Sequence, residues 1–110
     1  MDNVKNKNKY KKYFDILRGK TTHKVELGKY ILCYTYYYYP DQIILHIDYN
    51  SNTYECIIID KDIHILESLS NYFSFLRNSG LLESEFNITQ NNNNSIILSL
   101  QNETFLMKKI

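Results

Sequence analysis

Cys33, His46 and Asp48 are the side chains of this sequence that come closest to a catalytic set. A thiol, an imidazole and a carboxylate can act as nucleophile, general base and orienting group when they lie within hydrogen-bond reach of one another. Cys33 falls in one β-rich run, and His46 and Asp48 fall in the next, so all three are predicted to share one face of a sheet. The chemistry they support therefore depends on how the two runs pair.

The register that we expect between these runs places Cys33 opposite Asp48, and Thr35 opposite His46. Cys33 and His46 are then diagonal neighbours, about 7–8 Å apart at Cα, which is a poor geometry for proton transfer. No glycine turn or helix N-terminus is predicted nearby to bind an oxyanion. We therefore predict a protein that is not an enzyme. A metal site on His46 and Asp48 is equally unsupported by the sequence. No cofactor motif occurs in it.

The stretch from Lys29 to Asp60 contains three β-rich runs separated by two turn signals, which is typical of an antiparallel meander. Side chains alternate between the two faces of each strand, and burial should select the more hydrophobic face as the core. The residues of that expected core face are Leu32, Tyr34, Tyr36, Tyr38, Ile43, Leu45, Ile47, Tyr49, Tyr54, Cys56 and Ile58.

Two hydrophobic stripes with helical spacing flank the meander. The clearer one predicts a helix over residues 62–78, with Asp60 or Asp62 as N-cap and Gly80 at its end. A shorter one predicts a basic helix over residues 9–18, packed at an edge of the sheet or on its outer face. After residue 80 the apolar residues again fall at every second position, which predicts C-terminal strands. The expected fold class is α+β: an antiparallel β-meander sheet packed against one main helix, with the short basic N-terminal helix and these C-terminal strands.

A chain of 110 residues is predicted to form one domain, here residues 9–110 behind a flexible basic leader over residues 1–8. No apolar run approaches the ~18 residues that a membrane span needs, and the lysine-rich start lacks a secretory signal. We therefore expect a cytoplasmic protein with no membrane partner, whose two cysteines are free thiols. The abundance of Asn, Lys, Ile and Tyr indicates an AT-rich genome, such as that of a bacterium, a phage or a large DNA virus. A viral chain would work in the host-cell cytoplasm.

The outer face of the meander is the predicted binding surface. Its aromatic and aliphatic side chains would form an apolar patch that needs covering, and its charges would form a rim. The predicted partner-binding residues are Tyr37, Tyr39, Ile44, His46, Asp48, Glu55 and Ile57. The cover would be a foreign protein, the N-terminal helix, or a second copy of the chain in a homodimer. The function we predict is a small non-catalytic protein-binding or inhibitor module that occludes a macromolecular partner. Phage or viral anti-defence inhibitors and immunity-type proteins share this profile of short, motif-free chains.

The alternative is single-stranded nucleic-acid binding through the tyrosine-rich sheet and the basic N-terminus. Bases stack on aromatic side chains, and lysines follow the phosphates. Residues 1–30 carry nine basic and three acidic residues, whereas the rest of the chain is net acidic. The order of predicted elements also resembles that of the PUR and Whirly single-stranded DNA-binding proteins. The residues that would contact nucleic acid are Lys9, Lys11, Lys12, Arg18 and Lys20.

Overall fold

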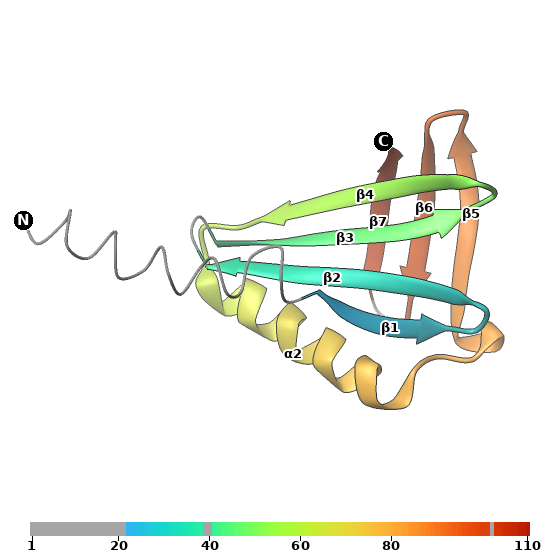
Figure 1. Cartoon of the computed structure of the whole chain (residues 1–110). Coiled ribbons are helices and arrows are strands. Elements are labelled where there is room, and N and C mark those ends of the chain that lie inside the picture. The colour runs from blue at the N-terminus through green and yellow to red at the C-terminus, as the bar shows by residue number, and fades with distance from the viewer. Residues whose placement is uncertain (1–21, 39–40, 102) are drawn as a thin grey trace, which may run out of the picture.

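The computed structural model describes residues 22–38, 41–101 and 103–110 of the chain. Within these residues, seven strands form one antiparallel sheet in the order β1-β2-β3-β4-β7-β6-β5, and one long helix packs against it (Figure 1). The prediction of an α+β fold with an antiparallel sheet and one main helix is confirmed. The helix predicted over residues 9–18 and the leader over residues 1–8 lie outside the described part of the chain.

Four consecutive strands make up the first half of the sheet. They are β1 (His23–Leu27), β2 (Tyr30–Tyr38), β3 (Asp41–Tyr49) and β4 (Asn52–Ile59). Each pairs with the next in antiparallel fashion, as expected for a meander. The turn between β3 and β4 consists of Asn50 and Ser51, whose φ angles are 50° and 67°. Two successive positive φ angles are typical of a type I′ hairpin turn, which fixes the β3–β4 register.

The register between β2 and β3 differs by two residues from the expected one. Cys33 lies opposite His46 and not opposite Asp48, so the expected cross-strand neighbours were wrong. The expected register assumed a longer connection, whereas the two strands remain paired up to Tyr38 and Asp41. A shift of two residues leaves every side chain on its face, because the faces alternate with a period of two. The predicted division into core and outer faces therefore holds.

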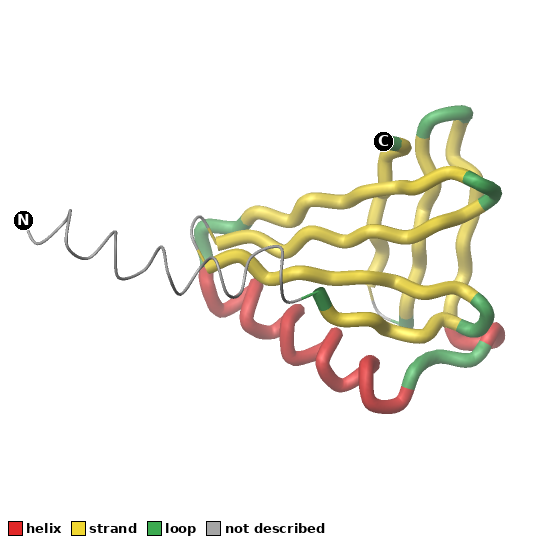
Figure 2. The backbone as a smooth tube through the Cα atoms, viewed as in Figure 1, coloured by secondary structure: helices red, strands yellow, loops and turns green. Residues whose placement is uncertain are grey.

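The second half of the sheet consists of β5 (Phe86–Asn92), β6 (Ser95–Leu100) and β7 (Glu103–Lys109), preceded by the short 3-10 helix η1 (Glu83–Glu85). β7 joins β4 through two residue pairs, Tyr54 with Lys109 and Glu55 with Lys108. Beyond these pairs the strands diverge, so that β5–β7 run across the direction of β1–β4 (Figures 1 and 2). The sheet is therefore curled, and its inner face surrounds the core.

The helix α2 (Ile63–Ser79) lies within one residue of its predicted bounds. The Asp62 carboxylate accepts the backbone N–H of His64 at 2.9 Å and caps the N-terminus, as predicted. Gly80, at φ 70°, ends the helix by donating its N–H to the Leu76 carbonyl. No helix in the described part of the chain is long and apolar enough to cross a membrane.

The core fills the space between α2 and the inner face of the sheet. Phe73 of α2 is fully buried, and its ring stacks on that of Tyr34 at 5.2 Å and lies 5.8 Å from that of Phe105. Most of the predicted core face is buried, namely Leu32, Tyr34, Ile43, Leu45, Ile47 and Tyr54. Others of the predicted set are partly buried and pack against this core, namely Tyr36, Tyr49, Cys56 and Ile58.

Candidate binding surface on the outer face of the sheet

The outer face of the sheet carries its side chains in rows that cross the strands. The first row is polar and contains Lys24, Cys33, His46, Glu55 and Lys108. The next row contains Thr35, Ile44 and Ile57, and the one after it contains Tyr37, Gln42 and Ile59. The shifted β2–β3 register places Thr35 opposite Ile44, and the β3–β4 register places Ile44 opposite Ile57, so these aliphatic side chains lie beside the polar row.

His46 and Glu55 form the central contact of the polar row. The imidazole Nε2 lies 2.8 Å from the Glu55 carboxylate, and both side chains are partly exposed. A partly exposed pair of this kind contributes little to stability, but it does orient the imidazole. Nearby, the Thr53 hydroxyl donates to the exposed Asp48 carboxylate at 2.6 Å.

Cys33, His46 and Glu55 follow one another in the order of nucleophile, base and orienting group, yet the thiol is not activated. No hydrogen bond between described residues joins the Cys33 thiol to His46. Burial raises the pKa of the Cys33 thiol and Asp48 raises it further, while Lys24 acts in the opposite direction. A raised pKa leaves little of the nucleophilic thiolate at neutral pH. Nor does any group of three or more His, Cys, Asp or Glu side chains in the described residues have the arrangement of a metal site.

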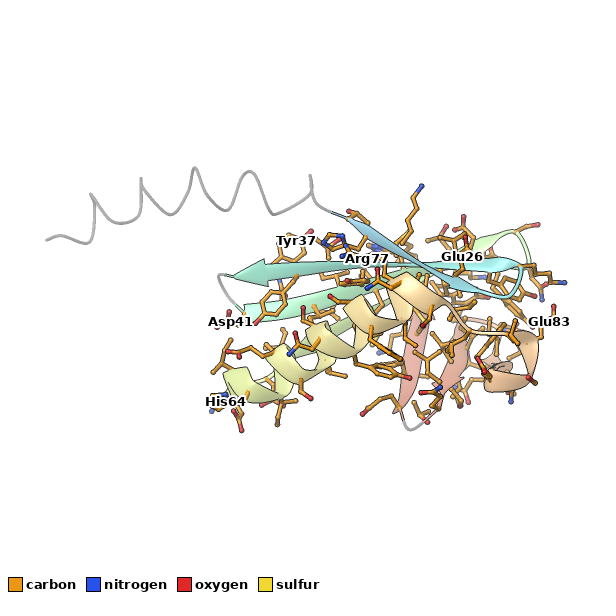
Figure 3. All side chains as sticks on the ribbon, turned by 90° about the horizontal axis from the view of Figure 1, so that it is seen from below. Glu26, Tyr37, Asp41, His64, Arg77 and Glu83 are labelled. Carbon is orange, nitrogen blue, oxygen red and sulfur yellow. The ribbon has the colours of Figure 1, made fainter. Side chains whose placement is uncertain are left out.

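We use the name aliphatic patch for Ile44, Ile57 and Ile59. Ile57 is 50% exposed and Ile59 is 66% exposed. Ile44, which lies between Thr35 and Ile57, is partly buried. Tyr37 adjoins the patch in the same row as Ile59, toward the end of the molecule where α2 begins (Figure 3). Large exposed aliphatic side chains grouped on a sheet are typical of interaction surfaces.

The structure brings together the predicted partner-binding residues that it describes. The residues that lie on the outer face are Tyr37, Ile44, His46, Asp48, Glu55 and Ile57. Tyr39 lies outside the described residues. The basic residues of the nucleic-acid alternative, Lys9, Lys11, Lys12, Arg18 and Lys20, also lie outside them. The rings of Tyr34 and Tyr54, which a base-stacking sheet would present to solvent, are buried in the core.

Beside the aliphatic patch, β4 has a free edge that sequence analysis did not predict. β3 pairs along one whole side of β4, whereas β7 pairs with the other side only at Tyr54 and Glu55. No other strand within residues 22–38, 41–101 and 103–110 pairs with that side of β4. The segment Cys56–Ile59 therefore has one unpaired edge, and the C-terminal half of β4 extends beyond β7 (Figure 1).

The direction of the backbone groups along this edge follows from one hydrogen bond and one hairpin turn. The Ile110 N–H donates to the Thr53 carbonyl at 3.0 Å, so the backbone groups of Thr53 point toward β7. On the other side, the hairpin turn closes between Tyr49 and Asn52, so Asn52 points toward β3. Because the two directions alternate along a strand, residues 53, 55, 57 and 59 all point toward the β7 side. Ile57 and Ile59 therefore present backbone groups that no described residue pairs, at the same place as exposed side chains.

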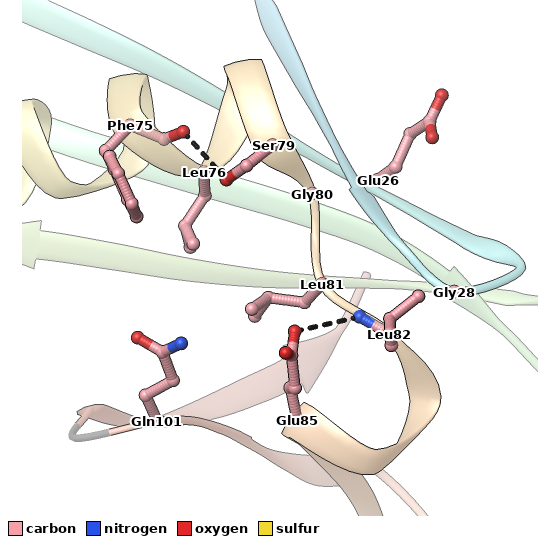
Figure 4. Close-up of a pocket in the computed structure, with 10 residues that line it drawn as sticks. All are labelled: Glu26, Gly28, Phe75, Leu76, Ser79, Gly80, Leu81, Leu82, Glu85 and Gln101. Carbon is pink, nitrogen blue, oxygen red and sulfur yellow. Dashed lines mark hydrogen bonds between the residues drawn. The ribbon is translucent and has the colours of Figure 1, made fainter.

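A pocket of about 540 Å³ lies at the opposite end of the molecule, between β1, η1 and the end of α2 (Figure 4). Its apolar lining comes from Phe75, Leu76, Leu81 and Leu82, and Gln101 and Glu85 add polar groups. The backbone around it is already paired: Gly28 donates to the Leu81 carbonyl, Leu81 donates to that of Glu26, and Leu82 donates to the Glu85 carboxylate. The pocket thus offers an apolar wall with few free hydrogen-bond donors.

Comparisons of the chain with protein-family models, with curated proteins and with solved structures found no match. Alternation predicted which residues face outward. It gave no sign of the free edge of β4, because that edge depends on where β7 leaves the sheet plane. It also gave no sign of the pocket, whose residues come together only when η1 packs beside the end of α2.

Proposed function

We propose that the protein is a non-catalytic protein-binding module that occludes a macromolecular partner with the outer face of β2–β4. The observation that carries this proposal is the exposure of Ile57 and Ile59 beside Ile44 and Tyr37. The opposite face of the sheet already packs against α2, so these side chains make no contribution to that core. Covering the exposed part of each isoleucine would contribute about 1–2 kcal/mol to binding.

The surroundings of the aliphatic patch support such a role. A cluster of apolar anchors bordered by polar groups is the usual anatomy of a protein interface. Tyr37 adds an aromatic ring at one side, and the pair of His46 and Glu55 borders the patch on another. Occlusion needs only such a surface and no catalytic group. This action fits an anti-defence inhibitor or an immunity-type protein of a phage or virus, working in the cytoplasm of the host cell.

The experiment is chemical cross-linking of the tagged full-length chain in its source cells, comparing the wild type with Ile57→Glu. Leu106→Glu is the matched control, because Leu106 is 48% exposed on the outer face of the other half of the sheet. We expect Ile57→Glu to reduce the cross-linked partner by about tenfold or more and Leu106→Glu to leave it unchanged. Thermal unfolding establishes that both variants fold. Equal capture by all three chains would refute the proposal.

A second copy of the chain is the other candidate cover for the patch. Light scattering of the purified wild-type chain over a range of concentrations tests this. If the wild type is a dimer and Ile57→Glu is a monomer, then the surface binds another copy of itself. The foreign-partner form of the proposal would then be wrong.

A further inference from the structure

We infer that the partner adds an extended segment to the free edge of β4, in register with Ile57 and Ile59. This inference rests on the proposed function and specifies how the partner is recognised. Sheet edges with unpaired backbone groups are templates for a further strand. When a peptide adds to such an edge, main-chain hydrogen bonds provide the affinity and alternate side chains provide the specificity.

The edge of Cys56–Ile59 offers both components. Ile57 and Ile59 each direct a backbone N–H and C=O away from β3, so an entering strand can form hydrogen bonds at both residues. Their side chains stand on the outer face, where residues of the entering strand would lie about 4.5–5.5 Å away between Cβ atoms. The segment contains no charged side chain and no proline, which are the usual means of protecting an edge. The segment that fits is therefore uncharged and aliphatic at the positions opposite Ile57 and Ile59.

The space at this edge favours a short linear segment over a second folded copy. At one end, Lys108 of β7 already pairs with Glu55, and at the other end the chain leaves β4 to enter α2 at Ile63. A strand between these limits has room for about four or five residues, or roughly 15 Å. A stable interface between folded subunits uses roughly 20–30 residues on each side. A second copy would also bring its own β7 and α2 against the same short edge.

The test combines a peptide probe with two variants of the full-length chain. The probe is a capped hexapeptide of alternating valine and threonine, and its control carries an N-methyl group on every backbone amide, so that neither edge can donate a hydrogen bond. At millimolar concentration the unmethylated peptide should shift the amide resonances of Ile57 and Ile59 and slow their hydrogen exchange. The hydrogen exchange of the Ile58 amide, which points toward β3 and is already paired there, should not change. The N-methylated peptide should have no effect, since it cannot complete the ladder.

Ile59→Pro removes one edge N–H but no bond to β3, because residue 59 points away from that strand. We expect this variant to bind the peptide, and the partner captured from cells, at least about tenfold more weakly. If Ile57→Glu loses the captured partner while Ile59→Pro keeps it, strand addition is wrong and face binding stands. If both variants keep it, the proposed function fails as well. A wild-type dimer that Ile59→Pro converts to a monomer would identify the occupant as a second copy and overturn the linear-segment inference.

Discussion

Replacing Phe73 with alanine should be among the most destabilising changes in this chain, because its ring joins the two halves of the curled sheet. The ring is fully buried and lies against Tyr34 of β2 on one side and Phe105 of β7 on the other. The β4–β7 ladder contributes just two residue pairs. The packing around Phe73 must therefore hold the halves together where the backbone ladder does not.

The expected magnitude follows from the burial of this ring. A buried phenylalanine replaced by alanine typically costs about 3–5 kcal/mol, which includes the cavity left behind. Aromatic contacts such as those with Tyr34 and Phe105 place Phe73 toward the upper part of that range. We expect a loss of about 4–5 kcal/mol. A domain of this size has a total unfolding free energy of about 5–15 kcal/mol, so the variant should be close to the limit of folding.

Urea unfolding of the full-length chain, followed by far-ultraviolet circular dichroism, measures this loss. Phe75→Ala is the matched control, since Phe75 lies on the same helix and is 63% exposed. It should cost less than about 1 kcal/mol, with the slope of the transition unchanged in both variants. If Phe73→Ala costs no more than Phe75→Ala, then the ring does not join the halves and the described packing is wrong.

Three further predictions concern other parts of the fold. Ser51→Gly should raise the unfolding free energy by about 0.5–1 kcal/mol. Ser51 has a φ angle of 67°, where glycine avoids the strain that a side chain causes. A lower urea midpoint for the variant would contradict this. Burial, helped by the positive charge of Arg77, lowers the pKa of His23 below its ordinary 6.5. The unfolded chain then takes up the proton more readily, so stability should fall as the pH drops below 6.5, and His23→Gln should flatten this dependence of the melting temperature. Burial also raises the pKa of Cys33 and Cys56, so iodoacetamide should alkylate both more slowly in the folded chain than in urea, and equal rates would refute the assignment.

Local patterns were sufficient to predict the helix and the core face. Asp62 and Gly80 mark the ends of α2 by interactions within a few residues of the chain, which sequence spacing records directly. The core face follows from strict alternation along β2 and β3, and the burial of Tyr34 and Leu45 confirms it. Both features depend on contacts between near neighbours in the sequence.

The cross-strand neighbours on the outer face could not be predicted in the same way. Connections of two and of four residues between β2 and β3 bury the same face, so hydrophobic patterning does not distinguish them. The choice decides whether Cys33 faces His46 or Asp48, and hence what the polar row contains. The alternation of residue types does not record which of these two registers forms.

The free edge of β4 follows from the curl of the sheet. Phe73 of α2 contacts both Tyr34 of β2 and Phe105 of β7, so the sheet must bend, and it bends where β7 leaves β4 after Glu55. Phe105 and Met107 of β7 thereby turn toward the core, where both are buried. Within the described part of the chain, the same divergence that completes the core leaves the backbone of Ile57 and Ile59 without a neighbouring strand on the β7 side. The proposed binding edge is therefore a geometric consequence of the packing around Phe73, and a loss of that packing should disturb the edge even though Phe73 never contacts a partner.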